Sequence, residues 1–174
     1  ITIVPRGMAG GMTISLPEED RSYLSKHYME DQLVGLLGGR VAESLCLGDI
    51  STGASNDIQR ATAIARKMVA VYGMSETLGT VSFDSGHDEV FIGRTMGHSR
   101  GYSEAVAAQI DQEVKSMMDG AYSRCQDLLE AHRPQLEAVA KYLLEHETME
   151  RDAFLKVFGE EAPETAENSE NENS

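Results

Sequence analysis

Apolar side chains recur at helical spacing early in the chain, which predicts two helices there. The first covers residues 27–47, and Gly38 and Gly39 within it indicate a close approach by a neighbouring backbone. A second helix is expected over residues 55–72, with the polar residues 55–57 as its N-cap. The apolar face of the first helix consists of Leu33, Leu36, Leu37, Val41 and Leu45.

The same periodicity continues through the second half of the chain. Ser103 can cap a long third helix, which the sequence 132–134 interrupts, and Pro134 is well placed to open a fourth. Thr148 is expected to cap a short last helix that Gly159 ends. The apolar positions of the third helix are Val106, Ile110, Val114, Met117, Ala121 and Leu128, and those of the fourth are Leu136, Val139, Ala140, Leu143 and Leu144.

Short β-branched runs predict a small number of strands. Residues 1–4 and 12–16 are expected to form a strand pair joined by a glycine-rich turn. Residues 81–83 and 90–92 could form a second pair, although their spacing favours it less. The predicted fold is therefore mainly α within the α+β class, with a small N-terminal strand pair followed by a helical bundle.

Composition sets the domain organisation and excludes some classes of partner. A chain of 174 residues with 41% hydrophobic residues can form one globular domain, which we assign to residues 1–159. Residues 160–174 carry six Glu and no Lys or Arg, so they are expected to be a disordered acidic tail. The net charge of −14 argues against nucleic acid as a partner, because phosphate binding needs a basic surface.

Motifs that carry chemistry are scarce. The two cysteines, Cys46 and Cys125, have no CxxC spacing, so each is expected to be a small buried hydrophobic residue in a reducing compartment. The five histidines include no HExxH pair, so this chain alone cannot assemble a zinc site of that type. No GxxxxGK[ST] loop is present, which argues against ATP binding here. Asp57, taken on its own, reads as an acidic residue that offsets the helix dipole, worth about 0.3–1 kcal/mol.

Ordered blocks of sequence nevertheless resemble one family. In order and spacing, the following stretches are similar to the FtsH-type peptidase domain: 1–7, 16–20, 36–43, 51–58, 61–68, 73–76, 89–94 and 147–148. The GGRVAE sequence at 38–43 and the TGASND sequence at 52–57 together carry most of the resemblance. Residues 1–159 would correspond to the C-terminal two-thirds of that zincin-like domain.

The resemblance implies a zinc endopeptidase that acts beside an ATPase domain. In the family two histidines of an HExxH helix and the aspartate that matches Asp57 hold the zinc, and the HExxH glutamate is the general base. Three protein ligands leave one position open for a water whose pKa the metal lowers. Glu43 resembles a family glutamate near the active site and is a candidate for orienting a metal-bound histidine. A helix-packing or surface role for Glu43 stays open.

The HExxH helix precedes the family's counterpart of residues 1–4 and is absent from this chain. We therefore expect no catalytic residue within the chain, and neither zinc binding nor peptidase activity by the chain alone. ATP would bind to a separate domain that this chain lacks.

Family membership would also imply partners and a location. The parent protein would be a homo-hexamer that degrades unfolded and membrane proteins at the cytoplasmic face of a bacterial membrane, or in an organelle. It would contact the membrane only through N-terminal segments that this chain lacks. The alternatives are a catalytically dead paralogue that acts in oligomerisation or as an adaptor and, without the resemblance, a helical protein-interaction domain.

Overall fold

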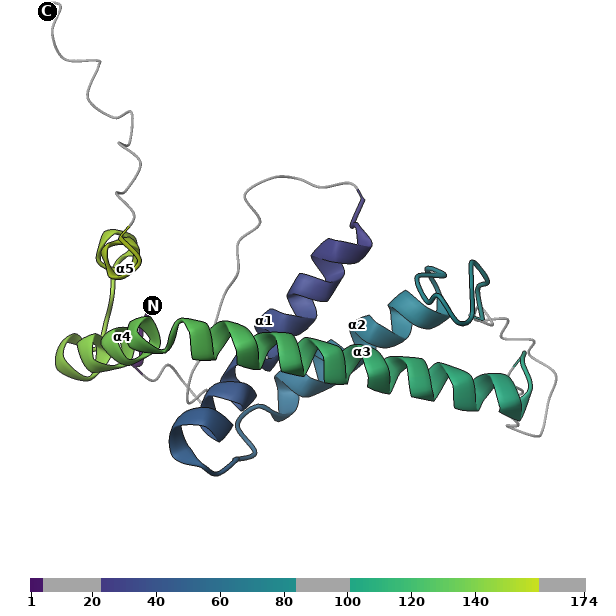
Figure 1. The fold of residues 1–174 in the computed structure, drawn as a ribbon, viewed down its shortest axis with the longest axis horizontal. Helices are drawn as coiled ribbons and strands as arrows, with labels where there is room; N and C mark the ends of the chain where they lie inside the picture. The colour runs from purple at the N-terminus through teal and green to yellow at the C-terminus, as the bar shows by residue number, and fades with distance from the viewer. Residues whose placement is uncertain (5–22, 84–100, 160–174) are drawn as a thin grey trace, which may run out of the picture. The chain divides into compact units, whose positions relative to one another are not determined.

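A computed structural model describes residues 1–4, 23–83 and 101–159, and their fold is mainly helical, as predicted (Figure 1). The chain divides into two compact units, one of residues 21–130 and one that combines residues 1–20 with 131–174. The helices of the described residues are α1 (Lys26–Leu47), α2 (Ser55–Ala70), α3 (Glu104–Ala131), α4 (Arg133–His146) and α5 (Arg151–Val157). None of these helices is long and apolar enough to cross a membrane.

Two of the helices in the 21–130 unit start at a serine whose side chain caps them. The Ser25 hydroxyl accepts a hydrogen bond from the Tyr28 amide at 3.2 Å at the start of α1. Ser103 accepts one from the Val106 amide at 3.3 Å at the start of α3, which confirms the predicted cap. At the other end of α1, Gly48 adopts a φ of +65°, which glycine tolerates without steric penalty.

The start of α2 differs from the prediction. Ala54, and not one of the polar residues 55–57, is the N-cap, and no side chain caps the helix there. Ser55 is already the first helical residue, with Asp57 in the first turn. The loop before α2 therefore has to set the direction of its first turn.

The core of the 21–130 unit lies between α1, α2 and α3. Alanines on α2 leave room for the larger side chains of α1 and α3. Cys125 is buried, as expected, and burial raises the pKa of its thiol; Cys46 is exposed, so the expectation for it was wrong. The core residues are Met29, Leu33, Leu37, Val41, Ala61, Ala65, Met68, Val69, Ile110, Val114, Ala121 and Cys125.

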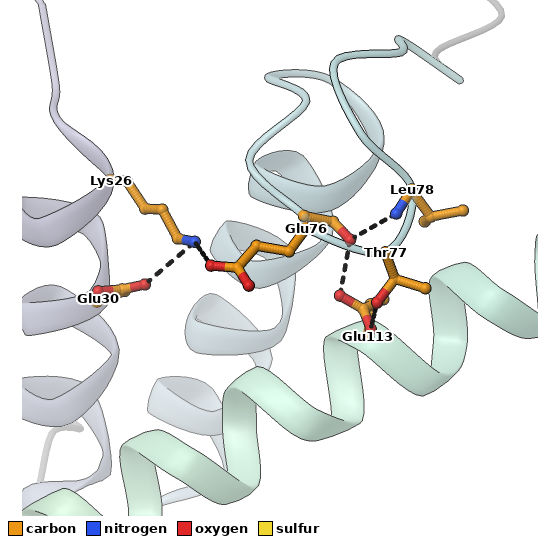
Figure 2. A network of polar contacts seen from close by, with 7 residues as sticks. Lys26, Glu30, Glu76, Thr77, Leu78 and Glu113 are labelled. Atoms are coloured by element: carbon orange, nitrogen blue, oxygen red, sulfur yellow. Dashed lines mark hydrogen bonds and ion pairs between the residues drawn. The ribbon is translucent and has the colours of Figure 1, made fainter.

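One carboxylate of α3 binds two side chains of the segment that follows α2. Glu113 accepts hydrogen bonds from the Ser75 hydroxyl at 2.7 Å and from the Thr77 hydroxyl at 2.9 Å. Figure 2 shows this contact next to Lys26, whose ammonium lies 3.9 Å from a Glu76 oxygen. Residues 81–83 form no strand, and their predicted partner at 90–92 lies outside the described residues.

In the other unit, the opening residues pair with a distant segment. Thr2 and Thr148 form an isolated antiparallel bridge, and the Ile3 amide donates to the Glu147 carbonyl at 3.0 Å. The proposed partner at residues 12–16 is outside the described part of the chain. Thr148 is engaged in this bridge, so it does not cap α5; Glu150 stands at that N-cap without a side-chain cap bond.

Candidate functional site

Asp57, the predicted metal ligand, lies in the first turn of α2. Its side chain is about half exposed, at 48%, and its Oδ1 atom lies 3.6 Å from Arg60 Nη1. That separation exceeds normal hydrogen-bond length, so the pair is a loose ion pair between neighbouring turns. The carboxylate is therefore accessible and not committed to a strong contact with Arg60.

Glu43 lies near the C-terminal end of α1 and bonds twice to one residue of the loop that leads to α2. Its Oε1 accepts from the Ser51 hydroxyl at 2.5 Å, and its Oε2 accepts from the Ser51 amide at 3.1 Å. Arg40, one turn earlier on α1, donates from Nη2 to the Ser51 carbonyl at 2.9 Å. We call these three residues the Ser51 clamp.

The Ser51 clamp shifts the ionisation of Glu43. The hydrogen bond from the Ser51 hydroxyl, followed by the one from the Ser51 amide, lowers the pKa of Glu43 below its ordinary value. The positive charge of Arg40 also lowers this pKa. Desolvation raises it, but by less than the two Ser51 bonds lower it. Glu43 is therefore held as a carboxylate at neutral pH.

Gly53 occupies a crowded position beside this clamp. A Cβ added there would lie 3.2 Å from Ser51 Oγ and 3.8 Å from Glu43 Oε1. The first distance is shorter than ordinary van der Waals contact, so any side chain at position 53 would press on the clamp. By contrast, an added Cβ at Gly38 or Gly39 meets no described atom within 4 Å, so none of the described residues makes the close approach predicted there.

The described residues contain one candidate zinc ligand, Asp57, and no complete zinc site. Within residues 1–4, 23–83 and 101–159, no three His, Cys, Asp or Glu side chains form a group that could hold a metal ion. Among the histidines, His27 Nε2 lies 3.6 Å from Asp31 Oδ2. In the unit that contains residues 131–174, His146 Nδ1 contacts the carbonyl of Tyr142 in the same helix. His87 and His98 are outside the described residues. An accessible carboxylate such as Asp57 fits a zinc ligand position, provided that other residues complete the set.

Two residues of this region were not singled out from the sequence. Ser51 opens the stretch that contains the TGASND sequence, and Arg40 belongs to the GGRVAE sequence, one turn before Glu43. The spacing of Arg40 and Glu43 on one helix face was the available signal. This spacing could not show that both side chains bind Ser51, because the path of the loop past α1 is a tertiary feature.

Comparison with known proteins gives one consistent result. The family described as "Peptidase family M41" matches residues 1–157. A relative from Thermoanaerobacter sp., named ATP-dependent zinc metalloprotease FtsH 1, is 56% identical over 161 residues, which make up 92% of this chain and 26% of the relative.

More distant relatives carry the same kind of name. The ATP-dependent zinc metalloprotease FtsH 2 of Alkaliphilus metalliredigens is 51% identical over 91% of this chain and 23% of its own length. The ATP-dependent zinc metalloprotease FtsH of Thermotoga maritima is 44% identical over 96% of this chain and 28% of its own length. The chain thus spans about a quarter of the length of the curated relatives it matches.

Proposed function

The chain belongs to peptidase family M41, and we propose that it forms the C-terminal two-thirds of the zinc endopeptidase domain in a longer, FtsH-type ATP-dependent protease. The observation that carries this proposal is an identity of 44–56% over more than nine-tenths of the chain to relatives whose names state that activity. The reaction would be the hydrolysis of peptide bonds, with ATP bound by a separate domain.

Asp57 is the residue of this chain that would contact the metal. Its position in the first turn of α2 and its half-exposed carboxylate support this role. A zinc ion with three protein ligands would supply a bound water of lowered pKa as the nucleophile. The two remaining ligands and the general base would come from an HExxH segment, which the 174 residues do not contain.

We propose the same parent assembly that the sequence resemblance implied. The parent would be a homo-hexamer that takes unfolded and membrane proteins as substrates. It would be anchored at the cytoplasmic face of a bacterial membrane by segments outside this chain. These proposals rest on the family resemblance alone.

The Asp57→Asn variant of the full-length protein tests the ligand assignment. Asparagine keeps the size of the side chain but removes its charge, and it is tolerated in the first turn of a helix. We expect casein degradation and zinc content to fall to background while ATP hydrolysis persists, because the ATPase lies in another domain. Full proteolysis with normal zinc content would refute the assignment.

A second test uses the 174-residue chain by itself. We expect no zinc-dependent degradation of casein and no stoichiometric zinc, because one carboxylate is a single ligand of three. The measurements are a casein assay with added zinc and metal analysis after dialysis. Chelator-sensitive proteolysis by the purified chain would show that a different metal site exists.

A further inference from the structure

Ser51 is attached to α1 through each of its polar groups. Its amide and hydroxyl donate to the Glu43 carboxylate, and its carbonyl accepts from Arg40. Both partners project from α1 next to Val41, which is completely buried in the core. The clamp is therefore built on a helix turn that packing already holds in place.

Overlapping hydrogen bonds lead along the loop from the clamp to the first turn of α2, which contains Asp57. The Gly53 amide donates to the Ser51 hydroxyl at 3.1 Å, and the Ser55 amide donates to the Thr52 carbonyl at 3.0 Å. The Ile58 amide then donates to the Ala54 carbonyl at 3.0 Å, which closes the first turn of α2 around Asp57. Because these bonds overlap along the chain, a shift of Ser51 would be passed on to that turn.

The first turn of α2 lacks the kind of support that the first turns of α1 and α3 have. It has no side-chain cap, whereas Ser25 and Ser103 cap α1 and α3. The loop therefore takes over the task of fixing the first turn. Ala54, the N-cap residue, is buried, so the clamp and the packing of Ala54 hold the turn from two sides.

We propose that Glu43 and Ser51 are positioning residues for Asp57, which they hold in place for metal binding through the loop backbone. This inference rests on the proposed function, in which Asp57 is a zinc ligand. It differs from the role expected from the sequence, in which Glu43 orients a metal-bound histidine. The contact that carries it is the double hydrogen bond between Glu43 and Ser51.

The test measures zinc affinity in the full-length protein with Zn²⁺ itself, by competition with a chelating dye. Ser51→Ala and Glu43→Gln should each raise the Kd for zinc roughly 10- to 100-fold, as removal of groups that support metal ligands typically does. Ser51→Thr keeps the hydroxyl and should restore tight binding. The double variant should raise the Kd by less than the product of the two single effects, because both changes weaken the same link.

Glu113→Gln is the matched control. It weakens a comparable carboxylate–hydroxyl clamp, the one to Ser75 and Thr77 in Figure 2, which leads to a different loop. We expect it to lower the Tm without changing the Kd for zinc. If Ser51→Ala and Glu43→Gln lower the Tm in the same way and leave the Kd unchanged, their role is structural only and the inference is overturned.

Hydrogen exchange gives a readout that does not depend on zinc. In Glu43→Gln the amides of Ser51, Gly53 and Ile58 should exchange faster, and unchanged protection there would also overturn the inference. Asp57→Asn separates the ligand role of Asp57 from the positioning role of Glu43 and Ser51. If it keeps its zinc, the ligand assignment within the proposed function fails; if it loses zinc while the clamp variants keep theirs, only the positioning role fails.

Discussion

At the scale of single residues, the partly buried Glu43 carboxylate accepts hydrogen bonds from two groups of one serine, Ser51. An isolated ion pair at the surface of a protein contributes little to stability. The bonds from Ser51 differ from such a pair because both come from one residue and the one from the hydroxyl, at 2.5 Å, is short. A group held in this way has a stability effect that depends on pH.

This pH dependence can be predicted with its sign. Because the folded-state pKa of Glu43 is lowered, its stabilising effect is complete above the ordinary value of 4.5 and is lost as the pH falls through the lower folded-state value. Glu43→Gln should therefore reduce the Tm most at neutral pH and progressively less below pH 4.5. Thermal melts of both proteins across this range check the prediction.

Ser51→Ala serves as the comparison in the same melts. It removes the hydroxyl, which is the largest cause of the lowered pKa, but leaves the amide bond possible. The Tm difference between Ser51→Ala and Ser51→Ala/Glu43→Gln should thus vary less with pH. An equally steep variation would mean that the Ser51 hydroxyl is not the main cause.

At the scale of elements, the helices begin in different ways, and these differences can be measured. Ser25 caps α1 by a side-chain bond, whereas Ser55 follows the uncapped start of α2 and sits inside that helix. The two serines look alike in the sequence, since each comes just before or at the start of an apolar periodic stretch. Only the hydrogen bonds distinguish them.

Replacing each serine by alanine should separate the two cases. Ser25→Ala should lower the free energy of unfolding by about 1 kcal/mol, because it leaves a helix amide without its partner. Ser55→Ala should change it by less than about 0.5 kcal/mol, since alanine is a good helix former and no cap is lost. Urea denaturation measures both, and equal losses would contradict the assignment of Ala54 as the N-cap.

The existence of these elements could be predicted from the sequence, and several of their details could not. Helical periodicity located α1 to α5, and Pro134 and Ser103 marked two of the helix starts. The cap of α2, the partner of residues 1–4 and the exposure of Leu128 depend on tertiary contacts, which periodicity does not contain. For the candidate site, the resemblance pointed to Asp57 and Glu43, but the Glu43–Ser51 contact needed the loop's path in space.

At the scale of the molecule, the 21–130 unit owes its core to three helices that meet along narrow apolar faces. Within α1, Leu33 is completely buried, whereas Leu47 is 75% exposed. The two leucines have the same chemistry and differ in environment. Comparing them therefore measures how much burial in the shared core contributes to the free energy of unfolding.

Leu33→Ala should lower the free energy of unfolding by about 2–5 kcal/mol, because it removes buried methyl groups and leaves a cavity between helices. Leu47→Ala, on the same helix, should change it by less than about 0.5 kcal/mol. Denaturant unfolding followed by circular dichroism compares them. Similar losses for the two variants would show that α1 does not pack through the predicted face.

The bridge between Thr2 and Thr148 has a consequence for the order of events during synthesis. The two residues are 146 positions apart, and ribosomes add roughly 5–20 residues per second. The opening segment is therefore synthesised roughly 7–30 s before its pairing partner. During that interval the backbone groups that pair with residues 147–149 are open to other strands, so a nascent chain stalled before Thr148 should bind chaperones or aggregate more readily than one stalled after α5.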